Sequence, residues 1–331
     1  MRLDLLVATF RRPELLAEAL RSMFAAPRPP GLDVRIIVVN NDRESDLHSL
    51  QSIIAAPPVP VLLLHEPRRG KSHALNLGIR ASDADYIGFV DDDERMAASW
   101  FEVAYGTLAP GRLDFIGGPM LPLWPSQPPA WIPQRYRAVL GIVDNGPARA
   151  VYSTEFPGML VGGNAIIRRT VLDAIGGFSP ELGPQEAHRL MSCEDEDVYG
   201  RLLNAGATGE YVPELVVHHH VHQDRLQPAY YRRWCFWNGA SKALLGRLQP
   251  ESVPTIGGVP RYMYGSALRA AGAGLKAWLM NRGAAARLEA ELPLWQLAGQ
   301  LYGRYGLRRL RPSSSATDPR VKDRLPSPRR Q

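Results

Sequence analysis

The sequence predicts an α/β fold whose mostly parallel sheet is covered by helices on both faces. Short apolar runs alternate with segments that carry apolar residues at helical spacing, and this alternation continues from residue 3 to residue 90. Polar clusters directly follow the apolar runs. Because ligands bind beyond the carboxyl ends of strands in such sheets, these clusters are expected to share one site.

Each element follows from its local pattern. The apolar runs at residues 3–8, 34–39, 61–64 and 85–90 predict strands. Pro13 suits the first turn of a helix, and the apolar stripe from Leu15 to Phe24 continues that helix. Residues 71–80 predict a second helix, 194–204 an acidic helix and 211–217 a further strand. Residues 117–147 are rich in Pro, Trp and Gly, which disfavours regular elements, so we expect an extended, partly ordered insertion there.

The composition divides the 331 residues into a main α/β domain over 1–240, an amphipathic helical extension over 241–311 and a disordered basic tail over 312–331. Residues 304–331 hold nine Lys and Arg against Asp318 and Asp323, so they carry +7 and the other residues sum to −1. A nearly neutral body argues against a nucleic-acid partner. The basic end is either an electrostatic tether or a solubilising tail.

Targeting features are absent from the sequence. The first apolar run is too short for a signal peptide, and no run of eighteen apolar residues occurs. Cys193 and Cys235 form neither a CxxC pair nor a disulfide framework. We therefore expect a cytoplasmic protein, with peripheral contact at the inner face of the cell membrane through the Leu-, Trp- and Arg-rich helices of residues 261–311. The alternative for these helices is packing on the main domain or in a dimer.

Two acidic clusters are the sharpest candidates for chemistry. Asp91-Asp92-Asp93-Glu94 follows an expected strand, and hard oxygen ligands of this kind suit Mg²⁺ or Mn²⁺ shared with phosphate. Glu194-Asp195-Glu196-Asp197 opens the acidic helix, where one carboxylate could act as a general base. The alternative for both clusters is a solvated turn or an acidic helix N-terminus.

Two further clusters are basic or rich in histidine. Arg68-Arg69-Gly70-Lys71 opens a helix and could bind a diphosphate, or it could be ordinary surface charge. Histidines occupy positions 218, 219, 220 and 222. Strand alternation would send His219 to one face and the other three to the opposite face. One histidine could complete a metal shell, whereas a zinc site made by these histidines alone is disfavoured.

In this order and spacing, the motifs resemble those of family 2 glycosyltransferases over roughly residues 3–240. The matching pieces are Val7-Ala8-Thr9-Phe10-Arg11-Arg12, Val38-Val39-Asn40-Asn41-Asp42, Gly70 to Gly78, Asp91-Asp92-Asp93, Leu160-Val161-Gly162-Gly163-Asn164, Gly176-Gly177-Phe178, Glu194-Asp195-Glu196-Asp197 and Val216-Val217-His218-His219-His220. Asn40 departs from the family pattern, which usually has an Asp there. The resemblance implies a GT-A fold.

The resemblance also implies roles for individual residues. The residues implied to bind the nucleotide sugar are Thr9, Phe10, Arg11, Asn40, Lys71, Asn76, Asp91 and Asp92. The metal would be bound by Asp93 and His219, and the acceptor side would include Gly163, Asn164 and Trp131. Asp195 would be the catalytic base, with Glu194 beside it.

The activity implied is an inverting transfer of a sugar from a UDP, dTDP or GDP donor to a hydroxyl of a glycan or lipid-linked acceptor, with Mg²⁺ or Mn²⁺ as cofactor. The Trp- and Pro-rich segment would line the acceptor side. Two other readings remain open: a catalytically silent scaffold or sugar-nucleotide-binding protein on the same fold, and a sugar nucleotidyltransferase. The intact acidic motifs argue against the scaffold, and the absence of a Gly-rich N-terminal signature argues against the nucleotidyltransferase.

Overall fold

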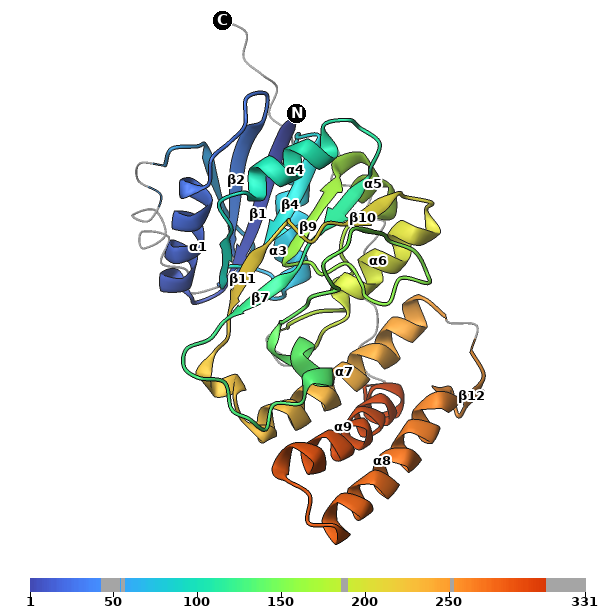
Figure 1. The fold of residues 1–331 in the computed structure, drawn as a ribbon. Coiled ribbons are helices and arrows are strands. Elements are labelled where there is room, and N and C mark those ends of the chain that lie inside the picture. The colour runs from blue at the N-terminus through green and yellow to red at the C-terminus, as the bar shows by residue number, and fades with distance from the viewer. Residues whose placement is uncertain (43–53, 55–56, 186–189, 251–252, 308–331) are drawn as a thin grey trace, which may run out of the picture.

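A computed structural model of the chain describes residues 1–42, 54, 57–185, 190–250 and 253–307 (Figure 1). Its main sheet has eight strands: β1 (Arg2–Thr9), β2 (Asp33–Asn40), β3 (Val61–His65), β4 (Tyr86–Val90), β6 (Phe115–Gly117), β8 (Ala150–Val151), β9 (Asn164–Arg168) and β10 (Gly209–Tyr211). Their order is β3-β2-β1-β4-β9-β6-β10-β8. Only β9 and β8 run antiparallel to their neighbours. The predicted fold class is confirmed.

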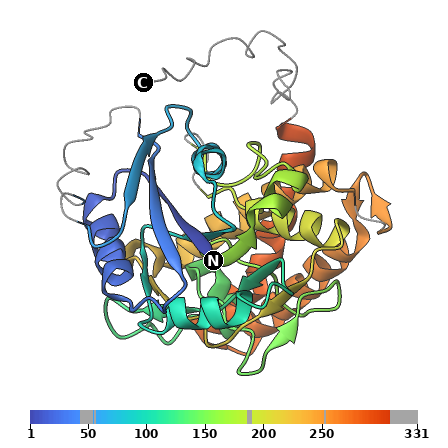
Figure 2. The same cartoon turned by 90° about the horizontal axis from the view of Figure 1, so that it is seen from above.

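Helices cover both faces of this sheet (Figures 1 and 2). One face packs against α1 (Pro13–Ala25) and α4 (Trp100–Leu108), and the other against α3 (Lys71–Ala81), α5 (Arg169–Ile175) and α6 (Glu194–Asn204). Strand β1 contributes to both layers. Leu5 packs in the apolar cluster beneath α1 and α4, and Leu6 packs in the cluster beneath α3, α5 and α6. Both residues are fully buried, which explains why the strands read as continuous apolar runs.

A second sheet of three strands joins segments that are distant in sequence. It contains β5 (Glu94–Met96), β11 (Val217–His220) and β7 (Met120–Leu123), in the order β5-β11-β7. Residues 117–147, expected to form an extended, partly ordered insertion, contain regular elements of their own, namely β7 and the 3₁₀ helix η1 (Gln134–Leu140). The strand expected over residues 211–217 is also divided. Pro213 cannot donate a ladder hydrogen bond, and a turn separates β10 from β11.

The C-terminal region is helical, as predicted. It comprises the short turn η2 (Gln223–Arg225), α7 (Pro228–Leu248), the hairpin β12 (Thr255–Ile256) and β13 (Val259–Pro260), α8 (Arg261–Leu279), α9 (Ala284–Leu301) and the π-helical turn η3 (Tyr302–Gly306). Helix α9 packs against both α7 and α8. Gly239 and Gly299 permit the close approach of α7 and α9, since a Cβ at Gly299 would lie 1.8 Å from the carbonyl oxygen of Phe236.

Helix α7 continues without interruption through residue 240, so the expected boundary at that point stays a prediction. The expected basic tail over residues 312–331 lies outside the described residues. Within the ranges that the structure covers, every helix is too short or too polar to cross a lipid bilayer.

Candidate active site

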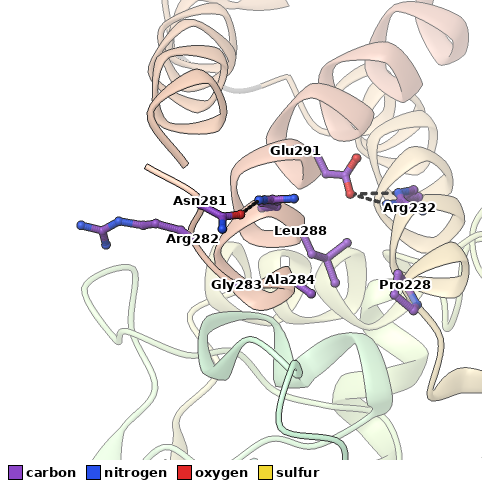
Figure 3. Close-up of a pocket in the computed structure, with 9 residues that line it drawn as sticks. Pro228, Arg232, Asn281, Arg282, Gly283, Ala284, Leu288 and Glu291 are labelled. Carbon is purple, nitrogen blue, oxygen red and sulfur yellow. Dashed lines mark hydrogen bonds and ion pairs between the residues drawn. The ribbon is translucent and has the colours of Figure 1, made fainter. Parts of the chain in front are cut away.

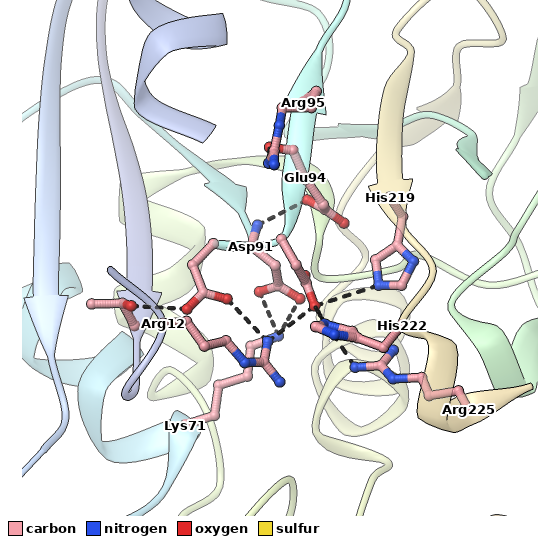
Figure 4. Close-up of polar contacts among 11 residues, drawn as sticks. Arg12, Lys71, Asp91, Glu94, Arg95, His219, His222 and Arg225 are labelled. Carbon is pink, nitrogen blue, oxygen red and sulfur yellow. Dashed lines mark hydrogen bonds and ion pairs between the residues drawn. The ribbon is translucent and has the colours of Figure 1, made fainter. Parts of the chain in front are cut away.

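The candidate site lies where the carboxyl ends of β1 and β4 meet the N-terminal ends of α3 and α6 (Figure 4). Strand β4 is buried along its whole length and delivers Asp91, Asp92 and Asp93 at its end. Asp92 and Asp93 are buried and Glu94 is fully buried, which is costly for acidic side chains unless charges or protons compensate them. The structure supplies both kinds of compensation.

Hydrogen bonds of Asp92 connect the end of β4 to the last residue of β1 and to the loop that follows it. Thr9 Oγ1 donates to Asp92 Oδ2 at 2.8 Å, and Arg12 Nη1 donates to Asp92 Oδ1 at 3.2 Å. Burial, followed by the neighbouring charge of Asp93, raises the pKa of Asp92 to about 6. Thr9 and Asp92, both predicted to bind the nucleotide sugar, are therefore bonded to each other inside the protein.

Asp93 lies at the centre of a cationic cluster. Its Oδ2 accepts a hydrogen bond from Arg12 Nη1 at 3.0 Å and lies 3.7 Å from Arg225 Nη2. His222 Nε2 and His219 Nε2 lie 3.3 Å and 3.7 Å from the same oxygen. Burial alone would raise the pKa of Asp93, but the hydrogen bond with His222 and the charges around it lower the pKa far below its usual range. Asp93 is therefore an anion at neutral pH.

His219 is buried and neutral. Burial lowers its pKa to about 4, although Asp93 opposes this shift. Its Nδ1 has no hydrogen-bond partner among the described residues, and its Nε2 is the ring nitrogen that lies 3.7 Å from Asp93 Oδ2. The predicted separation of the histidines is wrong for His222, because β11 ends at His220 and strand alternation stops there. The chain then turns and brings His222 to Asp93 beside His219.

Lys71 connects the two acidic clusters. Its Nζ lies 2.7 Å and 2.8 Å from the two carboxylate oxygens of Asp91. Burial alone would lower the pKa of Lys71, but nearby carboxylates raise it well above the ordinary value; after Asp91, the largest contributions come from Asp195 and Glu194. Lys71 opens α3, where Gly70 has a φ of 130° that favours glycine. Its cation therefore stays charged between groups that are 104 residues apart in sequence.

Asp195 and Glu194 reach the site because of the local geometry at the start of α6. Cys193 precedes them with a φ of 74°, a strained conformation for a residue with a side chain. Asp195 fits against Gly162, where an added Cβ would lie 2.2 Å from Asp195 Oδ1. Glu194 fits against Gly183 in the same way, with an added Cβ 3.0 Å from its Cδ. These two glycines make room for the two carboxylates.

Both carboxylates hold protons more tightly than usual. Burial, followed by the charge of Asp195, raises the pKa of Glu194 to about 8. Burial also raises the pKa of Asp195, against the opposing charge of Lys71. Asp195 borders an apolar hollow that includes Phe89 and Val198, and its Oδ1 has no hydrogen-bond partner among the described residues. An unpartnered carboxylate oxygen in apolar surroundings is suited to accept a proton.

The other two acids of the same cluster serve the fold. Lys242 Nζ donates a hydrogen bond to Glu196 Oε1. Asp197 Oδ2 accepts hydrogen bonds from Ser179 at 2.6 Å and from Arg201. The structure therefore distinguishes Glu194 and Asp195, which adjoin Lys71, from their two neighbours.

The side predicted to bind the nucleobase is built around Phe10. The guanidinium carbons of Arg69 and Arg11 lie 4.6 Å and 5.3 Å from the centre of its ring. Arg11 Nε also donates to Asp42 Oδ2 at 2.9 Å. Asn40 is buried, and its Oδ1 accepts a hydrogen bond from the backbone N–H of Asp42. Asn40 therefore shapes the turn that presents Asp42.

Two predicted site residues have their side-chain amides occupied by protein groups. Asn76 Nδ2 donates to Phe178 O at 2.7 Å, and Phe178 N donates to Asn76 Oδ1 at 2.8 Å. Asn164 Nδ2 donates to the carbonyl oxygens of Pro119 and Leu215, and its Oδ1 accepts from Trp100 Nε1. The side-chain amides of Asn76 and Asn164 therefore have a structural role in this protein.

The remaining predicted acceptor-side residues, Gly163 and Trp131, make contacts within the protein. An added Cβ at Gly163 would lie 2.3 Å from Glu94 Oε1, so this glycine makes room for the buried acid. Trp131 packs edge-on against Tyr231 of α7, with ring centres 5.4 Å apart, in an apolar cluster with η1 and α9.

No individual role was predicted for Arg12, Arg225 or Glu94, although Glu94 belongs to the acidic cluster predicted to suit a metal. Arg12 belongs to the quoted Thr9–Arg12 motif and precedes the first residue of α1, which could have indicated its position. Glu94 ends the acidic run, and its Oε2 accepts a hydrogen bond from the backbone N–H of Asp91 at 2.8 Å. Nothing in the sequence points to Arg225, which reaches Asp93 only because η2 folds back after β11.

A separate hollow of about 380 Å³ lies between the start of α7, the turn that joins α8 to α9 and the first turns of α9 (Figure 3). Arg232 and Glu291 form an ion pair on its wall. None of the residues predicted for the site lines this hollow.

Comparisons with known proteins identify the family. The sequence profile of glycosyl transferase family 2 matches residues 4–176. The succinoglycan biosynthesis protein ExoM of Rhizobium meliloti (strain 1021) is 29% identical over 254 residues, which are 76% of each chain. The pre-mycofactocin glycosyltransferase of Mycobacterium tuberculosis is 26% identical over 226 residues, which are 67% of this chain and 45% of that protein.

Two solved structures share the fold. A mannosyltransferase from Pyrobaculum calidifontis, PcManGT, in complex with GDP-Man and Mn²⁺, aligns with a TM-score of 0.62 and 17% identity over 92% of this chain and 87% of that chain. Residues 1–349 of S. aureus TarS align with a TM-score of 0.51 and 12% identity over 92% of both chains. With the profile match over more than half of its length, the chain belongs to glycosyltransferase family 2 and is a transferase with a GT-A fold.

Proposed function

We propose that this enzyme transfers a sugar from a nucleoside diphosphate donor to a hydroxyl group of a glycan or lipid-linked acceptor, with inversion at the anomeric carbon. One observation carries the proposal: partly buried Lys71 lies on Asp91, at the end of the strand predicted to hold the donor, and is close enough to Asp195 and Glu194 to interact with their charges. The donor site at Asp91 and the proposed catalytic carboxylates would thus lie around one cation, Lys71.

Asp195 is the proposed general base. Its carboxylate takes the proton of the acceptor hydroxyl, the acceptor oxygen bonds to the anomeric carbon, and the bond from that carbon to the diphosphate oxygen breaks with its electron pair leaving on the diphosphate. Attack on the face opposite the leaving group inverts the configuration. Glu194 is a weaker candidate because its pKa of about 8 keeps it protonated at pH 7. Lys71 lowers the pKa of both carboxyl groups, but at Glu194 the charge of Asp195 outweighs it, whereas at Asp195 the charge of Lys71 is the largest effect after burial.

The residues around Asp93 fit a divalent cation. A carboxylate with one or two neutral imidazoles is a donor set that Mn²⁺ and Mg²⁺ accept, and the low pKa of His219 keeps its ring neutral as a ligand must be. Among the described residues no three His, Cys, Asp or Glu side chains already form a metal site. Asp93 with His219 or His222 would hold the ion, with donor phosphate oxygens as further ligands. When bound, the ion would neutralise the leaving diphosphate.

Cationic side chains would help the protein hold the donor. Arg12 and Arg225 both face Asp93, where they could exchange a carboxylate for phosphate oxygens. Lys71 was expected to approach the diphosphate, and its position on Asp91 is compatible with contact to the donor. On the nucleobase side, Phe10 offers a ring and Asp42 a carboxylate. UDP, dTDP and GDP sugars remain the donors to test.

The relatives support the coarser features of this proposal. The neighbour solved with GDP-Man and Mn²⁺ favours a nucleotide sugar and a divalent metal, and the similarity to a succinoglycan biosynthesis protein favours polysaccharide synthesis. We place the reaction at the cytoplasmic side of the cell membrane, where a lipid-linked acceptor would be accessible.

Donor binding tests the proposal first. Thermal unfolding of the protein is measured with UDP-, GDP- and dTDP-sugars, each with Mn²⁺ or with EDTA. We expect stabilisation by one nucleotide class that requires Mn²⁺ and disappears in Asp93→Ala. The exposed Asp224, two residues after His222, provides the matched control Asp224→Ala, which should keep the stabilisation.

Turnover then tests the reaction. With the donor known, NMR of the product reports the anomeric configuration, and inversion is expected. A retained configuration would contradict the mechanism. If stabilisation by the donor does not require Mn²⁺ and persists in the Asp93→Ala variant, the metal assignment is contradicted.

A further inference from the structure

Helix α8 has two apolar stripes, and only one of them is covered. Met263, Ala267, Ala270 and Ala277 are buried, on the side where α8 packs against α9. The second stripe lies on the outer face and contains Leu268, Ala271, Leu275, Trp278 and Leu279. These five residues recur at spacings of three and four, so they share one side of the helix. We call this set the outer stripe of α8.

The outer stripe is strongly exposed. Leu268 is 75% exposed, Leu275 60% and Trp278 67%. Scattered exposed apolar residues are normal, but a continuous row of large ones marks an interaction surface. Helix α9 lies between α7 and α8, which places α8 at the outer edge of the helical region (Figure 1). The row is therefore open to a partner along its length.

The charges beside this stripe have one sign. From residue 261 to residue 288 the sequence has five basic residues and no Asp or Glu; the basic residues are Arg261, Arg269, Lys276, Arg282 and Arg287. Arg269 and Lys276 are exposed on α8 and follow Leu268 and Leu275 by one residue each, so they flank the same side of the stripe. An apolar row bordered by cations is the pattern of a helix that lies in the plane of an anionic lipid surface.

The end of α8 strengthens this pattern. Trp278, Leu279 and Met280 are consecutive and each is more than half exposed. They form the tip of the turn that leads into α9, followed by Arg282. Tryptophan is favoured at the boundary between acyl chains and headgroups because its ring is apolar and its N–H can bond to polar groups.

We propose that the outer stripe of α8 docks the enzyme on the surface of an anionic lipid bilayer, with Leu275, Trp278 and Leu279 entering the headgroup layer and Arg269 and Lys276 facing lipid phosphates. The charges disfavour a second copy of the chain as the occupant. In a symmetric dimer the same patch meets itself, so two basic faces without acids would repel each other. The basic residues 308–331 would be repelled for the same reason.

Vesicle sedimentation tests this surface without donor, acceptor or metal, so its result is separate from that of the proposed reaction. The full chain is mixed with phosphatidylcholine vesicles or with vesicles that contain about 30% phosphatidylglycerol, at low and high salt. We expect binding to the anionic vesicles that weakens as salt rises. In Leu275→Ser/Trp278→Ser the affinity should fall roughly tenfold or more, because two large apolar side chains no longer enter the lipid.

Two further variants control the comparison. Val151→Ser/Leu248→Ser removes two exposed apolar side chains elsewhere and should bind like the wild type. Arg269→Gln/Lys276→Gln should weaken binding only to the anionic vesicles. All variants keep the basic C-terminal end, and their unfolding temperatures should match because the altered side chains are exposed.

Three results would overturn the proposal. One is a wild-type protein that does not bind anionic vesicles at low salt. Another is a stripe variant that binds as well as the wild type, which would assign the binding to other basic residues. The third is a wild-type dimer, seen by analytical ultracentrifugation, that the stripe variant dissociates while vesicle binding is absent.

Discussion

Replacing Gly162 by alanine should disable the proposed base while leaving the fold intact. The new Cβ would lie 2.2 Å from Asp195 Oδ1 and 2.8 Å from its Cγ. Real contacts of this kind start at 3.0–3.4 Å, so the carboxylate must move by about 1 Å. A displacement of that size in a catalytic group costs roughly a hundredfold in rate. Gly162 does not have a positive φ, so the alanine meets only this steric conflict.

The assay is release of the nucleoside diphosphate from the donor identified by thermal shift, with the transferred product followed by NMR. We expect kcat to fall by about two orders of magnitude, with little change in donor-induced stabilisation. Gly106 is the matched control, because it is an exposed glycine of α4 with no atom within 4 Å of an added Cβ. Gly106→Ala should keep full activity and gain up to about 1 kcal/mol of stability.

A double-mutant cycle shows whether the effect passes through Asp195. Asp195→Ala alone should lower kcat more than Gly162→Ala does, and adding Gly162→Ala to it should change little. The reasoning is refuted if Gly162→Ala retains wild-type kcat. It is also refuted if the two losses multiply, since the glycine would then act on something other than this carboxylate.

Three further substitutions follow from the same geometry. Asn164→Ala leaves the Leu215 carbonyl and the Trp100 N–H without these partners, while the Pro119 carbonyl keeps its hydrogen bond from the Val217 backbone. Urea unfolding should therefore show a loss of about 2 kcal/mol or more, and a loss below about 1 kcal/mol would contradict this role. Glu194 favours its neutral form, so its contribution to stability is present at low pH and is lost as pH rises through about 8. The Glu194→Gln variant should therefore have a higher unfolding temperature than the wild type at pH 9 but not at pH 5. An equal difference in unfolding temperature at both pH values would refute the assignment. His219→Ala should weaken Mn²⁺-dependent donor binding roughly tenfold to a hundredfold, whereas His218→Ala, one position away on the other face of β11, should not.

The elements that the sequence predicts best are those with local patterns. Strands β1, β2 and β4 are buried apolar runs, β3 is an apolar run that is only partly buried, and α1 follows a helical stripe that begins at Pro13. Helix α6 begins and ends where its acidic start and apolar spacing predict. In contrast, β7 has a Pro-containing sequence, and it forms a strand because β11 pairs with it from about a hundred residues further along the chain. Pairing over that distance leaves no local pattern to detect.

The same division explains the site. Asp91, Asp93 and Asp195 could be proposed because acidic clusters at the ends of elements are unusual in sequence. Their partners could not, since Arg225 reaches Asp93 through a turn that no motif marks. His222 was placed on the wrong side because the position where β11 ends is set by tertiary contacts. Motif order thus identifies the acids, but it does not show which cation neutralises each one.

The protonation of the acids assigns different chemistry to the two ends of the site. Asp93 has a lowered pKa and remains an anion, whereas Asp92 beside it has a raised pKa. At the other end both Glu194 and Asp195 have raised pKa values, and Lys71 opposes the shift of each. A fixed anion suits a cationic ligand, and a carboxylate with a raised pKa suits proton uptake near neutral pH. We therefore expect the metal and the diphosphate to bind at Asp93, and the acceptor hydroxyl at Asp195.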